Sequence, residues 1–204
     1  MDRGTPLPGR PAGTARAAWL DESFQEQDSA GFYILAAAVI EPDAADTVRE
    51  AMRGLRGRRA TAKAHWTEMD HRDRCAAARL VAGLPGLHVV SVGSPVPLRR
   101  QERARSKCLT ALVVELHGFG VAQLYMEARE KELNSRDVTT VIAARSGLPK
   151  GTRFRVDHVL GAMEPLLWVA DVVAGACRAE RLGRGEYRDL LGGTVLDFDV
   201  HTAC

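Results

Sequence analysis

Acidic residues next to apolar segments are the feature of this 204-residue sequence best suited to chemistry. Asp21 and Glu22 follow a short apolar segment near the amino terminus, and Glu127 ends another one in the second half of the chain. Asp171 interrupts a long apolar stretch, where an ionised carboxylate is costly unless it faces water, a partner or a cation. Oxygen ligands without Cys or His neighbours suit Mg²⁺ or Mn²⁺. The acids are therefore candidates for a divalent metal site.

The chemistry of such a site depends on whether Asp21 and Glu127 meet. If their strands are parallel neighbours, the strand axes lie ~4.8 Å apart and both acids project from the same end of a sheet. Converging carboxylates repel one another, so one pKa should rise unless a divalent ion compensates the charge. Paired ions ~3.5–4 Å apart can activate water and stabilise the leaving oxygen of a phosphodiester. This arrangement favours hydrolysis of phosphodiester bonds.

Apolar periodicity and turn residues predict the elements that position these acids. The first three expected strands suit an antiparallel meander, and the later ones alternate with helices, which favours right-handed parallel crossovers. The sequence therefore predicts an α/β fold with a mixed five-stranded sheet, flanking helices and a helical insertion at about 42–84. The expected strands are 17–20 (ending at the acids 21–23), 31–40, 87–92, 121–126 and 153–157, with 194–198 as a further candidate, and the helices are 41–55, 70–83, 98–117, 130–146 and 164–182.

Composition favours one globular domain, because 46% of the residues are apolar and 26% are charged. We expect a disordered tail at 1–16, one domain at 17–182, and an extension of the same domain at 183–204. The longest apolar run, 31–40, is about half of the ~20 residues needed to cross a bilayer, which argues against a membrane partner. The amino-terminal residues lack the apolar segment of a secretory signal.

The four cysteines show no CxxC pair, which is typical of reduced thiols and indicates a cytoplasmic protein. A net charge of +2 neither requires nor excludes a polyanionic partner. Arg99, Arg100 and Arg103 enter the expected helix 98–117 as a basic run. A solvated helix face is one interpretation of this run, and contact with nucleic-acid phosphates is the other. No series of aromatic residues suggests recognition of a specific single strand.

Three short motifs, in this order, resemble the bacterial family called domain of unknown function 3800. The first is Trp-Leu-Asp-Glu-Ser-Phe at 19–24, which is similar to the family's Tyr-Ile-Asp-Glu-Ser-Gly. The second is Lys-Ala-His-Trp-Thr-Glu at 63–68, similar to a His-aromatic-x-Glu segment. The third is Leu-Leu-Trp-Val-Ala-Asp-Val at 166–172, where the family has Leu-Gln-Leu-Ala-Asp-Leu. The resemblance spans about residues 17–182.

This resemblance implies an RNase H-like fold and a metal-dependent nuclease that acts on nucleic acid. By analogy with RNase H-like nucleases, Asp21, Glu127 and Asp171 would be ligands of Mg²⁺ or Mn²⁺. A fourth acid has no clear match in the expected helix 98–117. Glu68 and Glu102 are the candidates for that acid, and either Glu68 or Glu164 would assist catalysis.

Other interpretations of the same residues stay open. Asp21 suits a turn at a strand end, and Glu22 would be exposed on the opposite face of its strand. Glu127 suits an ion pair with Arg129 or Arg153, and Asp171 a buried ion pair with an arginine. The chain as a whole could be a non-catalytic module that binds nucleic acid or protein. A Ser/His hydrolase ranks last, because the sequence lacks a nucleophile elbow.

Overall fold

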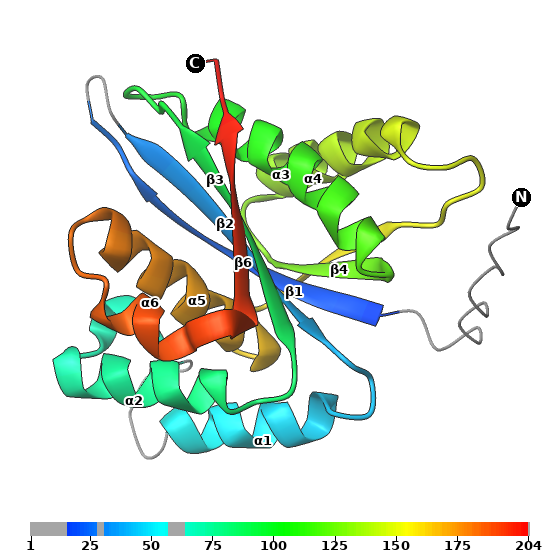
Figure 1. Ribbon diagram of the computed structural model, residues 1–204. Coiled ribbons are helices and arrows are strands. Elements are labelled where there is room, and N and C mark those ends of the chain that lie inside the picture. Colours follow the sequence, from blue (N-terminus) through cyan, green and yellow to red (C-terminus); the bar gives the residue numbers. More distant parts are fainter. Residues whose placement is uncertain (1–15, 28–30, 57–63, 204) are drawn as a thin grey trace, which may run out of the picture.

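A mixed sheet in the order β5-β4-β1-β2-β3-β6 forms the centre of the computed structural model, which describes residues 16–27, 31–56 and 64–203 (Figure 1). The strands are β1 (Arg16–Gln25), β2 (Phe32–Ile40), β3 (Leu87–Ser94), β4 (Val121–Glu127), β5 (Arg155–Val159) and β6 (Val195–His201). The α-helices are α1 (Ala45–Arg56), α2 (His71–Ala82), α3 (Gln101–Gly118), α4 (Lys131–Ala144), α5 (Leu166–Arg181) and α6 (Glu186–Leu191). Short 3₁₀ turns are η1 (Trp66–Glu68), η2 (Arg145–Gly147) and η3 (Gly192–Thr194).

The strand directions confirm the expected mixed sheet. β1, β2 and β3 are antiparallel neighbours, whereas β4 runs parallel to β1 and β5 parallel to β4. The sheet differs from the expected five strands in that β6 pairs in parallel with β3. Without β6, the backbone groups of β3 would form an open sheet edge, which proteins usually cover.

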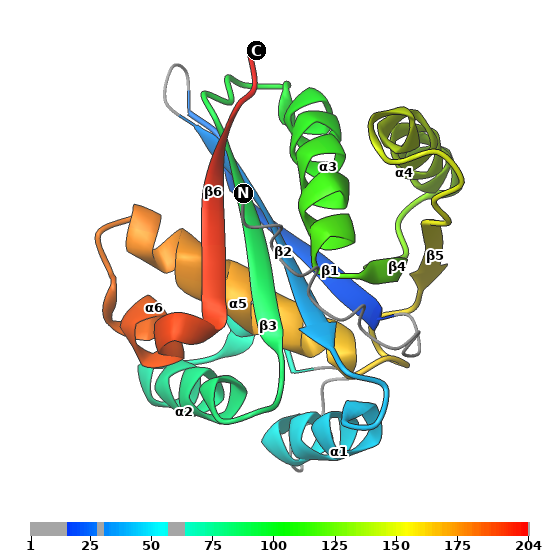
Figure 2. The same ribbon diagram turned by 45° about the vertical axis from the view of Figure 1, so that its right-hand side comes forward.

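Helices cover both faces of the sheet, so β2 is buried along its whole length. Its side chains alternate between two cores. One core lies under α1, α2, α5 and α6, and the other under α3 and α4 (Figure 2). The three consecutive alanines 36–38 give β2 a low strand propensity, but their small side chains suit a strand with helices packed on both sides.

The first strand is longer than its sequence suggests. The prediction that Asp21 and Glu22 end this strand is wrong, because β1 continues to Gln25. The reason is that β2 pairs with β1 as far as the partners Gln25 and Phe32, well beyond the end of β4. Asp21 therefore lies in the middle of β1, at the point where its parallel neighbour β4 ends.

The two ends of the chain differ in what the structure describes. Of the expected tail 1–16, only Arg16 lies within the described residues, and it begins β1. Within the segment 183–204, Tyr187, Leu191 and Val195 pack in the same core as α5. In the ranges that the structure describes, no helix is both long and apolar enough to cross a membrane.

Candidate carboxylate site

Asp21 and Glu127 lie side by side on adjacent parallel strands. Leu20 of β1 pairs with Met126 of β4, so the two acids occupy the next position on each strand. Two residues earlier, Trp19 and Tyr125 stack with ring centroids 5.4 Å apart and face the core under α5. Because side chains alternate along a strand, Asp21 and Glu127 project to this same face. Both line one small cavity of about 60 Å³, together with Leu20, Glu22, Arg105 and Arg129.

Gly161, in the turn after β5, makes room for the Glu127 carboxylate. A Cβ atom at this position would lie 2.2 Å from Glu127 Oε1, so any other residue would collide with the acid. The turn itself is tied to α5, because Trp168 Nε1 donates a 2.7 Å hydrogen bond to the Gly161 carbonyl oxygen. The carboxylate of Glu127 is thus held beside the backbone that leads into α5.

Asp171, on α5, anchors the η1 turn. The residue is 7% exposed, and its Oδ2 accepts a 2.7 Å hydrogen bond from the backbone N–H of Trp66. His65 Nδ1 lies 3.3 Å from the same oxygen. The Trp66 ring packs on the backbone of α5 at Gly175, where a Cβ atom would come within 2.3 Å of the ring. The buried acid therefore accepts a hydrogen bond from a backbone amide and lies within ion-pair distance of a histidine, and no arginine of the described residues pairs with it.

The structure thus brings two of the three predicted ligands together. Within residues 16–27, 31–56 and 64–203, no three His, Cys, Asp or Glu side chains are placed to hold one ion. The Asp21–Glu127 pair suits Mg²⁺ nevertheless, because that ion usually binds one or two carboxylates and keeps several waters. A cavity of about 60 Å³ has room for several water molecules, since about 10–15 Å³ of such space is enough for one. The pair therefore fits a single hydrated ion, and Asp171 does not complete its ligand set here.

The other predicted acids lie away from this cavity. Glu68 is exposed on η1. Glu102, on α3, accepts a 2.6 Å hydrogen bond from Arg129. Glu164 is clasped by Arg49 of α1, whose Nε and Nη2 lie 2.9 and 3.0 Å from its two oxygens. Glu102 and Glu164 are thus engaged in ion pairs with arginines.

The opposite face of β1 carries a buried ion network that sequence reasoning missed. Glu22 binds Arg105 of α3 and Tyr33 of β2, so the expectation that Glu22 is exposed is wrong. Its side chain is 25% exposed, because the helix that packs on this face supplies a cation for it. In the sequence, Arg105 follows the basic run of Arg99, Arg100 and Arg103 and looks like a further member of it. Its helical spacing to Cys108, Leu109 and Leu112 is the signal that could have placed it on the buried face.

Asp137 of α4 is the centre of that network. Its oxygens accept hydrogen bonds of 2.8 and 2.9 Å from Arg105 and of 3.1 Å from Arg129, and His158 Nε2 lies 3.3 Å away. Burial alone would raise the pKa of Asp137, but the hydrogen bonds and positive charges of these neighbours outweigh it and hold that pKa well below its usual value. Burial lowers the pKa of Arg105, opposed by its hydrogen bonds to Asp137. The network fixes the wall of the cavity to which Arg105 and Arg129 contribute.

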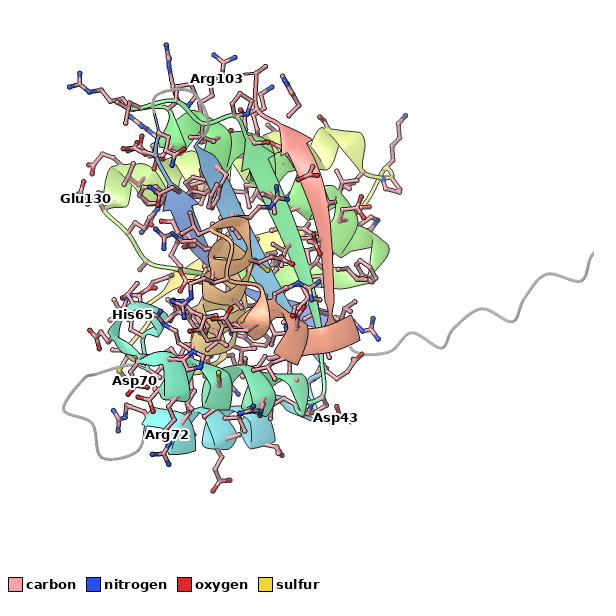
Figure 3. The ribbon with its side chains drawn as sticks, turned by 60° about the vertical axis from the view of Figure 1, so that its left-hand side comes forward. Asp43, His65, Asp70, Arg72, Arg103 and Glu130 are labelled. Carbon is pink, nitrogen blue, oxygen red and sulfur yellow. The ribbon has the colours of Figure 1, made fainter. Side chains whose placement is uncertain are left out.

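The predicted basic run lies at the start of α3. Arg99, Arg100 and Arg103 are all exposed, and Figure 3 shows Arg103 at the end of the molecule far from His65. Arg103 also lines a hollow of about 460 Å³ between α3 and α4, together with Arg136 and several hydroxyl side chains. These three arginines do not pack in the core, which agrees both with a solvated helix face and with a surface that contacts phosphates.

Comparisons with known proteins support the fold and do not identify a family or an activity. No protein-family model matches the sequence, and no curated protein matches it. Among solved structures, the chain is similar to one in the PCNA:RNase HII complex from Archaeoglobus fulgidus, with a TM-score of 0.54 and 14% identity over 88% of this chain and 80% of that chain. The fold is therefore RNase H-like, as the sequence motifs implied. Membership of the family of unknown function 3800 stays a prediction.

Proposed function

We propose that this chain is a metal-dependent nuclease whose reaction takes place at the Asp21–Glu127 pair. The observation that carries the proposal is the meeting of two carboxylates on adjacent parallel strands, on one face, in one cavity. Glu127 ends β4, and Asp21 lies where the parallel pairing of β1 with β4 ends. Sites of open parallel sheets lie at the carboxyl ends of such strands. The RNase H-like fold supports the assignment by analogy only, because one fold serves many functions.

Each residue of the site has a role in this proposal. Asp21 and Glu127 would hold Mg²⁺ or Mn²⁺, which when bound makes water a better nucleophile and neutralises charge on the phosphoryl group. Gly161 leaves room for the Glu127 carboxylate. Asp171 stays the third acid of the site, and in the described conformation it orients η1, which carries Glu68. Arg99, Arg100 and Arg103 would contact phosphates of the nucleic acid outside the site.

Cleavage of labelled RNA, DNA and RNA–DNA hybrid with Mg²⁺ or Mn²⁺ tests the proposal. The single substitutions Asp21→Asn and Glu127→Gln should each lower the rate about a hundredfold or more, since even the outer partners of metal ligands are worth 10–100-fold. Gly161→Ala should also lower it, because the new Cβ displaces the Glu127 carboxylate without removing it. Asp43→Asn is the matched control, as Asp43 is exposed and distant from His65 (Figure 3). Equal cleavage by wild type and an Asp21→Asn/Asp171→Asn double variant would remove the proposed active site.

A non-catalytic module that binds nucleic acid or protein is the second candidate. The separate position of Asp171, whose carboxylate is directed to η1, favours it. Titration calorimetry with Mn²⁺ distinguishes the two candidates. A nuclease should take up the ion in a manner that Asp21→Asn abolishes, whereas a binding module need not take it up at all.

A further inference from the structure

Two neighbouring hollows form a groove that leads away from the carboxylate cavity. The first, about 280 Å³, begins at Glu22 and Ser23 of β1, and Glu22 also lines the carboxylate cavity. The second, about 310 Å³, continues across η1 and α5 to α2. The hollows share Trp66, Thr67 and Arg178, so they are continuous. We call this surface the arginine groove and define it by Trp66, Thr67, Arg74 and Arg178.

Two of the three arginines that line these hollows, Arg74 and Arg178, are held in place without being neutralised, whereas the third, Arg184, pairs with Glu186. Arg178 donates from Nε to the Phe24 carbonyl oxygen (3.2 Å) and from Nη2 to Gln25 Oε1 (2.7 Å). Arg74 donates from Nε to the Trp66 carbonyl oxygen (3.3 Å), and its guanidinium lies 5.2 Å from the centre of the Trp66 ring. All these acceptors are neutral. Within the ranges that the structure describes, neither arginine forms an ion pair with a carboxylate.

The other cations around the site differ in this respect. Arg49, Arg105 and Arg129 each bind one or two carboxylates, so their charge is compensated inside the protein. The arginine groove therefore combines a fixed, uncompensated positive charge with an open, elongated shape. Such a surface suits a ligand with repeated negative charges, because ordered guanidinium groups bind phosphate oxygens well.

We propose that the arginine groove binds the sugar–phosphate backbone of the nucleic-acid strand whose bond is cleaved at the Asp21–Glu127 pair. The inference rests on the proposed nuclease function and adds the path of its substrate. Trp66 is 6% exposed and its ring is packed on α5, so it offers no surface for base stacking. Contacts to phosphates alone carry no sequence information. Binding in the groove is therefore independent of base sequence.

Fluorescence anisotropy with a labelled single-stranded oligonucleotide in EDTA tests the groove without cleavage. Arg74→Gln/Arg178→Gln should weaken binding about tenfold at low salt, and should reduce the slope of log K against log salt by about 1.4, at ~0.7 per phosphate contact. Arg72→Gln is the matched control on the same helix. Figure 3 shows Arg72 on the side of α2 that faces away from His65, so this variant should bind like the wild type.

A second double variant shows whether weaker binding comes from lost charge or from lost folding. Arg74→Lys/Arg178→Lys keeps both charges and should recover most of the binding, which separates a charge effect from a loss of folding. The inference is overturned if the glutamine variant binds like the wild type, if Arg72→Gln weakens binding equally, or if the wild type binds no oligonucleotide. Equal competition by poly-glutamate would also overturn it, because the groove would then accept any polyanion. A wild type that binds in EDTA but cleaves nothing with Mg²⁺ or Mn²⁺ refutes only the nuclease proposal.

Discussion

His88, the second residue of β3, should make the stability of the protein depend on pH. Its side chain lies on the same face of β3 as those of Val90 and Val92, which belong to the core under α5. His88 is 2% exposed. Neither ring nitrogen has a hydrogen-bond partner in the described part of the chain. Burial lowers the pKa of His88 from 6.5 to about 4. The folded protein therefore keeps this histidine neutral at pH values where the unfolded chain would protonate it.

The size of the effect follows from that difference in pKa. The unfolded chain binds more protons between the two pKa values, so stability is full above the unfolded value of 6.5 and falls as the pH drops towards about 4. At about 1.36 kcal/mol for each pKa unit, the full loss is about 3 kcal/mol, and about 2 kcal/mol of it has been reached near pH 5. Asp137 contributes little to the change in stability between pH 6.5 and about 4. Its pKa is lowered in the folded protein, so its stabilising effect is lost only when the pH falls below the ordinary pKa of an aspartate, 3.8.

Urea unfolding of wild type and His88→Leu at about pH 7 and about pH 5 measures this contribution. The wild type should lose about 2 kcal/mol more than the variant between the two pH values. Leucine cannot titrate, and it removes both unsatisfied nitrogens while keeping a side chain of similar size. Equal losses in the two proteins would refute the reasoning, since they would show that His88 titrates alike in the folded and unfolded states.

Further predictions concern the packing around the site. Asp137→Asn removes the carboxylate that binds two nitrogens of the buried Arg105 and leaves it only Glu22, so it should cost about 3–5 kcal/mol in urea unfolding, whereas a loss below about 1 kcal/mol would contradict the proposed network. Gly175→Ala should destabilise the protein by about 1–3 kcal/mol, because its Cβ collides with an indole ring. The matched Gly54→Ala, with open space around it, should stabilise α1 by about 0.5–1 kcal/mol by the same measurement. Burial raises the pKa of Cys177 to about 12, so thiol reagents near pH 8 should label it only in urea.

The sequence predicted most of the elements, though not α6, and it predicted one contact of the site on the condition that the first and fourth strands are parallel neighbours. Local patterns end β4 at Glu127, and the alternation of strands and helices places β4 beside β1, which brings Asp21 and Glu127 together. The contacts of Asp171 and Glu22 could not be predicted in this way. Asp171 binds a backbone amide 105 positions away, and the partner of Glu22 is 83 positions away on α3. Such partners depend on how the helices dock on the sheet, which hydrophobic periodicity does not specify.

The extension of β1 beyond Asp21 illustrates the same limit. No residue from 21 to 25 marks a strand, since four of the five are polar. Their strand conformation comes from pairing with β2, whose apolar sequence is buried on both faces. The sixth strand was visible only as the candidate at 194–198, and it extends to His201 because β3 offers a partner at its edge.

The adjacent residues Asp21 and Glu22 fix the register of β1 in the sheet. Asp21 projects to the face of the sheet under α5, while Glu22, one position later, binds the buried Arg105 on the side of α3. A shift of β1 by a single residue would exchange the two sides, moving Glu22 away from Arg105 and turning apolar side chains towards the wrong helices. Insertions or deletions of one residue before Asp21 should therefore abolish activity and folding together.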